Sequence, residues 1–297
     1  MVGIACAAMF FSIGCSMSQK TVVKPSQAPV ALQSASRDEL IQRYNQQAND
    51  ITSLNASVTM QLTAGSAYTG TIEQYHEITG FILAQKPASI RVIGQIPLVG
   101  KNIFDMESDG STFRIFVPSK NQFIVGPASL ERPSEKPIEN LRPQHLIDAM
   151  FWQPIPARVP VLFEEATEDN KGYYVLIVAR PASSAEPAKT TAAANDAWEI
   201  DRKIWVDRKD LNFTRIETYD SDGKAISDIR YTGWEMFGTA KYARQIALSR
   251  PVNDYQIQIG ITKLTVNEPI TADRFELNQP EGTELVQVGE NTKESRP

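Results

Sequence analysis

The sequence predicts a mainly β protein with a small helical part, in which a strongly curved antiparallel sheet forms an unclosed half-barrel of roughly eleven strands. Segments of alternating apolar and polar residues follow one another along most of the chain, and turn sequences such as Asp109-Gly110 and Asp222-Gly223 separate them. Two amphipathic segments, one before the first strand and one in mid-chain, predict an N-terminal helix and a short helix that cover the concave face.

The chain begins with a short apolar run that ends at a cysteine. Val2 to Phe11 precedes Ser12-Ile13-Gly14-Cys15, and a run of about 13 residues is shorter than the roughly 20 that span a bilayer. This pattern is typical of a bacterial lipoprotein signal peptide, residues 1–14, whose removal leaves Cys15 to carry the lipid, with acyl chains such as palmitate. An ordinary secretory signal and a buried N-terminal segment are the alternatives.

Residues 15–35 are polar, small and proline-containing, which predicts a flexible tether behind the lipidated Cys15. A helix is expected to begin after the tether, because Ser36 and Glu39 have the spacing of a capping box. Apolar residues then recur on one helical face out to about Leu54: Leu40, Tyr44, Ala48 and Ile51.

From Asn55 the period of the apolar residues changes to two, which is typical of half-buried strands. The expected strands are 55–62, 71–84, 90–96, 101–108, 112–117, 161–165, 173–179, 198–206, 212–219, 225–234, 241–248 and 255–262. Because this spacing continues through both halves, we predict one domain, residues 36–288, followed by a flexible tail, 289–297.

Two segments interrupt the strands. Residues 127–143 are rich in proline and charge and lead into 144–152, where i,i+4 apolar pairs predict a short helix. Residues 181–196 are of low complexity and predict a mobile hairpin tip. We therefore place the mid-chain helix between the two sets of strands.

Composition and motifs argue against several functional classes. The net charge is −5 without blocks of like charge, which argues against a nucleic-acid partner. Two histidines, and no cysteine beyond Cys6 and Cys15, make a zinc site improbable, and Asp220 to Gly223 is better interpreted as a hairpin turn than as a calcium loop. No nucleophile elbow, paired catalytic carboxylates or phosphate-binding glycine loop is found. We predict no catalytic residues, no metal and no cofactor.

The order of these parts resembles the LolA/LolB family, the periplasmic carrier and outer-membrane receptor of bacterial lipoproteins. The resemblance spans roughly residues 36–288 and includes short motifs. These are Lys86-Pro87 with Ile90-Arg91, Asp109-Gly110 with Phe113, Pro97-Leu98-Val99-Gly100, the helix of Pro143 to Trp152, and Asn267 to Phe275.

The resemblance implies a half-barrel that binds acylated cargo, namely lipid or lipoprotein acyl chains, and a periplasmic carrier protein as the partner that delivers it. It also implies attachment to a membrane through the N-terminal lipid. Ser16, rather than Asp, follows Cys15, which favours the outer membrane, with the domain facing the periplasm. The loops at 127–143 and 181–196 exceed those of typical members, so a lipoprotein of the same fold with different cargo stays open.

Nine residues are expected to line a cargo cavity on the concave face. Apolar lining favours acyl chains through burial, at about 0.8 kcal/mol per CH₂, and the two basic residues would order the mid-chain helix or bind a cargo carbonyl or phosphate. The alternative is that the apolar residues form an ordinary core and the basic ones pair on the surface. The nine are Val58, Met60, Leu62, Lys86, Arg91, Leu146, Ile147, Met150 and Phe151.

Leu98 and Val99 stand at a predicted hairpin turn, where apolar side chains have no local reason to occur. The resemblance implies that a protruding leucine here passes on or inserts the cargo, so we predict that this tip contacts membrane or cargo. The alternative is burial of both residues against the 127–143 loop.

Two functional hypotheses follow from the sequence. A lipid- or lipoprotein-binding module predicts an apolar cavity that opens to solvent. A structural or assembly lipoprotein, which holds a protein partner in the envelope, predicts a filled interior and an apolar patch outside. Residues that face a cavity and residues that face a core alternate identically along a strand, so the pattern leaves both hypotheses open.

Overall fold

The computed structural model describes residues 31–66, 70–128, 141–182 and 197–288. The chain divides into two units after Ala31, and all secondary-structure elements named below belong to the second. The predicted signal peptide, Cys15, most of the tether, most of the low-complexity segment and the predicted tail lie outside the described residues.

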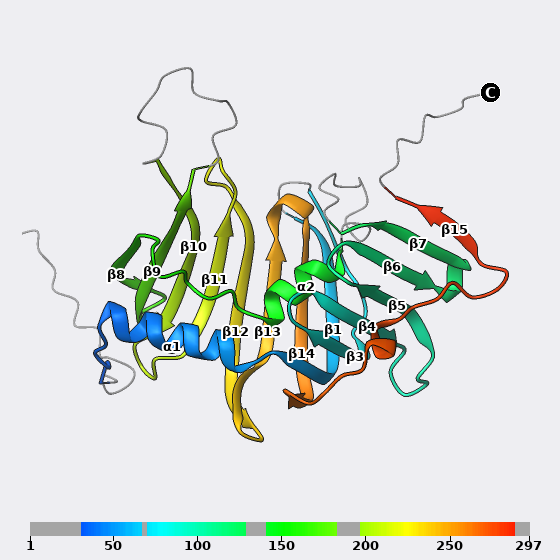
Figure 1. The fold of residues 1–297 in the computed structure, drawn as a ribbon, viewed down its shortest axis with the longest axis horizontal. Coiled ribbons are helices and arrows are strands. Elements are labelled where there is room, and N and C mark those ends of the chain that lie inside the picture. The colour runs from blue at the N-terminus through cyan, green and yellow to red at the C-terminus, as the bar shows by residue number, and fades with distance from the viewer. Residues whose placement is uncertain (1–30, 67–69, 129–140, 183–196, 289–297) are drawn as a thin grey trace, which may run out of the picture. The chain divides into compact units, whose positions relative to one another are not determined.

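Within the described residues, fifteen strands form one unclosed, curved sheet (Figure 1). The first half contains β1 (Ser53–Ser66), β2 (Thr71–Gln74), β3 (Ile78–Gln85), β4 (Ser89–Gln95), β5 (Asn102–Ser108), β6 (Thr112–Val117) and β7 (Gln122–Pro127). The second contains β8 (Val161–Glu168), β9 (Lys171–Pro181), β10 (Trp198–Asp207), β11 (Phe213–Tyr219), β12 (Ala225–Phe237), β13 (Ala240–Arg250), β14 (Tyr255–Val266) and β15 (Glu284–Gln287).

The sheet consists of two meanders joined in its middle. Its order is β15-β7-β6-β5-β4-β3-β1-β14-β13-β12-β11-β10-β9-β8, and β2 pairs with β1 outside this path. The pairing of β1 with β14 joins the two meanders, and β15 pairs in parallel with β7, at the edge of the first meander. The predicted curved, unclosed sheet is confirmed, and it has more strands than the roughly eleven expected.

The additional strands come from three places. Residues 71–84, expected to be one strand, form β2 and the greater part of β3, separated by Tyr75–Glu77. Strand β7 follows the turn at Pro118–Lys120, where Asn121 at φ +53° redirects the chain. The short β15 carries only four residues, too few for a period of two to stand out from the sequence.

Helix α1 (Arg37–Asp50) begins with the predicted capping box. The backbone N–H of Ser36 donates to Glu39 Oε2 at 2.8 Å, and the backbone N–H of Glu39 donates to Ser36 Oγ at 3.3 Å. The helix ends at Asp50 rather than near Leu54, because Ile51 is already extended and β1 begins at Ser53. Its buried residues are Leu40, Tyr44 and Ala48, on the predicted face.

Helix α2 (Pro143–Met150) is the predicted mid-chain helix, with its proline in the first turn, where the missing N–H leaves no bond unmade. Both helices pack on the same face of the sheet, which we call the inner face (Figure 1). The order of helix, meander, short helix and meander is the one that the LolA/LolB resemblance predicts.

The opposite, outer face is covered at one end by the chain that follows β14. This segment, which we call the strap, comprises residues 267–283 and includes a short 3₁₀ helix, η4 (Ala272–Phe275). It passes β1 and β4, where Ser53 Oγ donates to the Glu268 carbonyl at 3.0 Å and Arg91 donates to the Arg274 carbonyl at 3.1 Å. The strap then leads into β15 at the edge of the sheet.

None of the helices in the described part of the chain combines the length and the hydropathy that a membrane-spanning helix needs.

Candidate functional site

Five aromatic side chains from α1, the segment just after α2, β11 and β12 meet on the inner face. Trp152 is at their centre: its ring stacks on Tyr44 with centroids 5.1 Å apart and meets Phe213 edge-on at 5.3 Å. Tyr231 and Trp234 contact it at 5.4 Å and 5.9 Å. We call this group the aromatic cluster. Edge-to-face and offset pairs at such distances stabilise a core beyond simple burial.

Two buried tyrosines hold the end of α2 against the sheet. Tyr231 donates its hydroxyl proton to the Ala149 carbonyl at 3.0 Å, and Tyr242 donates to the Met150 carbonyl at 2.6 Å. These carbonyls belong to the last turn of α2, which has no helical partners for them. Burial raises the pKa of both hydroxyls, so they stay protonated donors. The end of α2 is thereby fixed over β12 and β13.

The eight predicted cavity residues other than Arg91 lie on the inner side of the sheet or on the helix that covers it. Seven are apolar members of one packed core or contact it: Val58, Met60, Leu62, Leu146, Ile147, Met150 and Phe151. Leu62 is half-buried and the other six are almost fully buried. Neither of the two cavities described below has any of the seven in its lining. Their role as a cargo cavity stays a prediction.

Lys86 joins the ends of the two helices. Its ammonium group donates to the Ala48 carbonyl in the last turn of α1 and lies 5.5 Å from the centre of the Phe151 ring, just after α2. A cation at this place complements the negative end of the α1 dipole. Burial lowers the pKa of Lys86. The contact places the ammonium group beside the end of the mid-chain helix, and a role of this lysine in ordering that helix stays a prediction.

Arg91 does not share a face with the other eight residues. Its neighbours Ile90 and Val92 are fully buried on the inner side, and successive side chains of a strand point to opposite faces. On the outer face the guanidinium forms two hydrogen bonds with Asp105, at 3.1 and 2.8 Å. Arg91 therefore points to the outer face of β4 and does not face the expected cavity.

A cavity of about 590 Å³ lies between the second half of α1 and the turn that joins β12 to β13. We call it the α1 groove. Its apolar lining includes Ile51, Met236 and Phe213, and Phe213 also belongs to the aromatic cluster. Arg43 and Lys241 contribute cations, and Lys241 Nζ donates to Asn212 Oδ1 at 2.5 Å. Sequence reasoning missed this groove, because its walls come from segments distant in the chain.

The turn between β4 and β5, which we call the β4–β5 tip, exposes its apolar residues as predicted. Leu98 is fully exposed and Val99 is 72% exposed; residues 129–140 of the loop named in the alternative lie outside the described residues. The N–H of Val99 donates to the Pro97 carbonyl at 2.8 Å, and Leu98 between them has φ +67°. A leucine in this region is strained, at a cost of about 1–2 kcal/mol. The backbone thus directs a large apolar side chain into water.

Polar side chains gather where α2 begins. His145 Nδ1 and the Tyr255 hydroxyl are 2.5 Å apart. Burial, with the nearby charges of Arg250 and Arg142, lowers the pKa of His145 to about 3. His145 is half-buried, and with this pKa its imidazole is neutral at pH 7. Asp148 keeps part of its surface in water, and partial desolvation raises the pKa of its carboxyl group. Among the described residues, no group of three or more potential ligands is placed to hold a metal ion.

No model of a protein family and no curated protein matches this sequence. Similar solved structures include a LolA superfamily protein from Nitrosomonas europaea, at 10% identity and a TM-score of 0.48, covering 82% of this chain and 99% of that one. A DUF1329 family protein from Desulfovibrio piger has 14% identity and a TM-score of 0.49, covering 80% and 94%. A putative outer membrane lipoprotein-sorting protein domain from Vibrio parahaemolyticus has 11% identity and a TM-score of 0.45, covering 80% and 95%.

Proposed function

We propose that this protein is an outer-membrane lipoprotein, anchored through Cys15, whose domain faces the periplasm and binds acylated or other apolar cargo without catalysis. Its role would be the transfer or insertion of lipid or lipoprotein, with a periplasmic carrier protein as a possible donor. The observation that carries the proposal is the β4–β5 tip, where Leu98 is fully exposed in a strained conformation.

The tip has the properties of a membrane- or acyl-binding element. Ile96, Leu98 and Val99 are exposed together on one hairpin, and exposed apolar groups of this kind mark contact sites. Burying one leucine or valine side chain in an acyl environment contributes about 1.5–3 kcal/mol. The cross-strand bond from Ile96 N–H to the Lys101 carbonyl, at 2.9 Å, holds the base of the turn. A firm base lets the side chains insert without reordering the sheet.

The α1 groove supplies a place for the apolar part of the cargo. Its volume of about 590 Å³ falls within the 300–1,000 Å³ range of small-molecule sites. Met236, exposed at its edge, has a flexible thioether that adapts to irregular chains. The seven apolar residues of the predicted cavity lie where the helices meet the sheet, and movement of α2 would be needed to admit cargo there.

The test is Leu98→Glu, measured as binding to phosphatidylethanolamine–phosphatidylglycerol vesicles and as uptake of a triacylated lipopeptide. We expect an unchanged melting temperature and loss of most binding, because a carboxylate at the tip opposes entry into an apolar phase. Val252→Glu is the matched control, since Val252 is also exposed and lies outside the tip. Equal binding by the Leu98→Glu variant and the wild type would refute the proposal.

A second candidate function is structural: the same lipoprotein would hold a protein partner in the envelope. The observation that favours it is the inner core, where the helices and the sheet form one packed apolar cluster. Native mass spectrometry on protein purified from a periplasm separates the two. A co-purified acyl-bearing species, with uptake of added lipopeptide, supports cargo binding. A lipid-free mass, with a protein bound through the β4–β5 tip, supports the structural role.

A further inference from the structure

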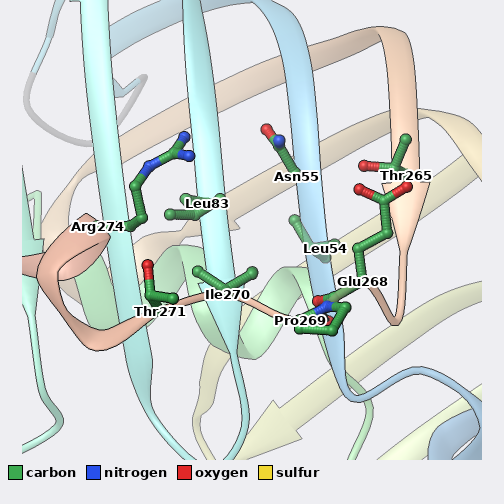
Figure 2. Close-up of a pocket in the computed structure, with 10 residues that line it drawn as sticks. Leu54, Asn55, Leu83, Thr265, Glu268, Pro269, Ile270, Thr271 and Arg274 are labelled. Atoms are coloured by element: carbon green, nitrogen blue, oxygen red, sulfur yellow. Dashed lines mark hydrogen bonds between the residues drawn. The ribbon is translucent and has the colours of Figure 1, made fainter.

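A small crevice of about 120 Å³ opens on the outer face beside the strap (Figure 2). One wall is a row of directly paired residues on three neighbouring strands: Thr265 of β14, Asn55 of β1 and Leu83 of β3. The other wall is the strap itself, which contributes Ile270. Leu83 is 8% exposed, so the crevice has an apolar floor.

The strap is fixed at both ends of the crevice. At the β14 end, the side chain of Asn267 accepts from the Thr52 N–H at 2.9 Å and donates to the Asp50 carbonyl at 2.6 Å. At the β4 end, Arg91 donates to the Arg274 carbonyl at 3.1 Å while Asp105 holds the same guanidinium. The crevice is therefore preformed, which lowers the entropic cost of binding.

The polar side chains that border this crevice include Asn55, Thr265, Glu268 and Arg274. Within the part of the chain that the structure describes, none of the four side chains forms a hydrogen bond or an ion pair. Figure 2 shows Arg274 and Glu268 on opposite sides, with Leu83 and Asn55 between them. The crevice thus offers a cation at one end, an anion at the other, and an amide in the middle.

We propose that this crevice binds a short peptide with free ends, whose ammonium group meets Glu268 and whose carboxylate meets Arg274. The amide of Asn55 both donates and accepts, as a peptide group does. Glu268 follows β14 and Arg274 lies beside β4, with β1 and β3 between these strands. The Glu268 carbonyl accepts a hydrogen bond from Ser53 of β1, and the Glu268 side chain lies beside Thr265 of β14. The two charges are therefore two to three strand intervals of about 4.8 Å apart, or about 10–14 Å, and an extended residue spans about 3.5 Å. The matching ligand is a peptide of three or four residues.

The same spacing argues against a zwitterionic lipid headgroup, whose two charges lie only a few bonds apart. The volume of about 120 Å³ equals about four water molecules at ~30 Å³ each, so it admits one small apolar side chain over Leu83. This site is on the outer face, and the proposal does not depend on the function proposed for the inner face and the β4–β5 tip.

The experiment is a calorimetric titration of the full chain with tetraalanine that has free ends, and with its N-acetylated and C-amidated forms. We expect millimolar or tighter binding of the free peptide and about two- to fivefold weaker binding of each blocked form. Arg274→Gln should weaken the free peptide to the level of the amidated one, and leave the amidated one unchanged. Glu268→Gln should do the same for the acetylated form.

Matched controls are Lys263→Gln on the outer face of β14 and Glu276→Gln on the strap, because neither residue lines the crevice. Unchanged melting temperatures check that all four variants fold. Absence of tetraalanine binding at millimolar concentration overturns the proposal. So does binding of glycerophosphoethanolamine in place of the peptide, or equal losses in the control variants.

Discussion

The two faces of the sheet are built from the same strands but are stabilised by different interactions. The inner face is apolar, and its polar groups are mostly hydroxyls and backbone carbonyls, as in the bond from Tyr242 to Met150. The outer face of β10 to β12 carries ion pairs: Arg215 forms two 2.8 Å bonds with Asp228 and lies over Trp205, whose indole N–H donates to Glu217 at 2.7 Å.

This difference indicates which face stabilises the fold and which surfaces can contact ligands. Burial of large apolar side chains contributes several kcal/mol each, whereas ion pairs near water contribute about 0–1 kcal/mol. We therefore expect the inner face to determine whether the protein folds. The tip and the outer crevice, which add little to stability, are free to present groups to ligands.

The largest expected effect concerns the centre of the aromatic cluster. Trp152→Ala removes the ring that touches four others and should lower the free energy of unfolding by about 3–5 kcal/mol. Urea denaturation measures it. Trp205→Ala on the outer face is the matched control and should cost less than half as much. An equal cost at both tryptophans would break the comparison between the faces.

An intermediate effect concerns His145. Burial lowers its pKa to about 3, below the value of about 6.5 in the unfolded chain. The unfolded state therefore binds a proton first as pH falls, and stability drops between these two values. From about pH 7.5 to about pH 5 the loss is about 2 kcal/mol.

His145→Asn keeps a polar group near Tyr255 and removes the titration. We expect the stability advantage of the wild type over this variant to shrink by about 2 kcal/mol over that pH range. The raised pKa of Asp148 acts in the opposite direction but is present in both proteins. A constant difference between the two proteins would show that His145 is not neutral in the fold.

The smallest effect concerns the β4–β5 tip. Leu98→Gly removes the strain at φ +67° and should raise the free energy of unfolding by about 0.5 kcal/mol, because glycine adopts this conformation freely but loses more entropy on folding. Binding to vesicles should fall at the same time. Leu98→Ala separates the two effects, since it removes the side chain and keeps the strain. A loss of stability in the glycine variant would contradict this assignment.

Local signals predicted much of the fold. The capping box of Ser36 and Glu39, the Asp-Gly turns and the period of two each depend on neighbours in sequence, and the corresponding elements formed where expected. Leu98 and Val99 could be placed at an exposed turn for the same reason. These elements could be predicted because the residues that determine each of them lie close together in the sequence.

The parts that sequence reasoning missed depend on register and on distant segments. Whether Arg91 faces the core is decided by its register with β3 and β5, where it pairs with Leu83 and Glu107. The aromatic cluster gathers rings from Tyr44 to Trp234, and the outer crevice needs the strap to cross three strands. No periodicity within one segment carries that information.

The pairing of β1 with β14 in the middle of the sheet has a consequence for how the chain folds. Strands β3 to β7 and β8 to β13 form hairpins from near neighbours, whereas β1 pairs with β14 across a large part of the sequence; Ser57 and Thr262 are 205 residues apart. Contacts of such long range form slowly. Until β14 has been synthesised, β1 and β13 each keep an unpaired edge, the kind of edge at which strands of separate molecules associate. The centre of the finished sheet thus closes late, and its strand edges can associate with other molecules before it does.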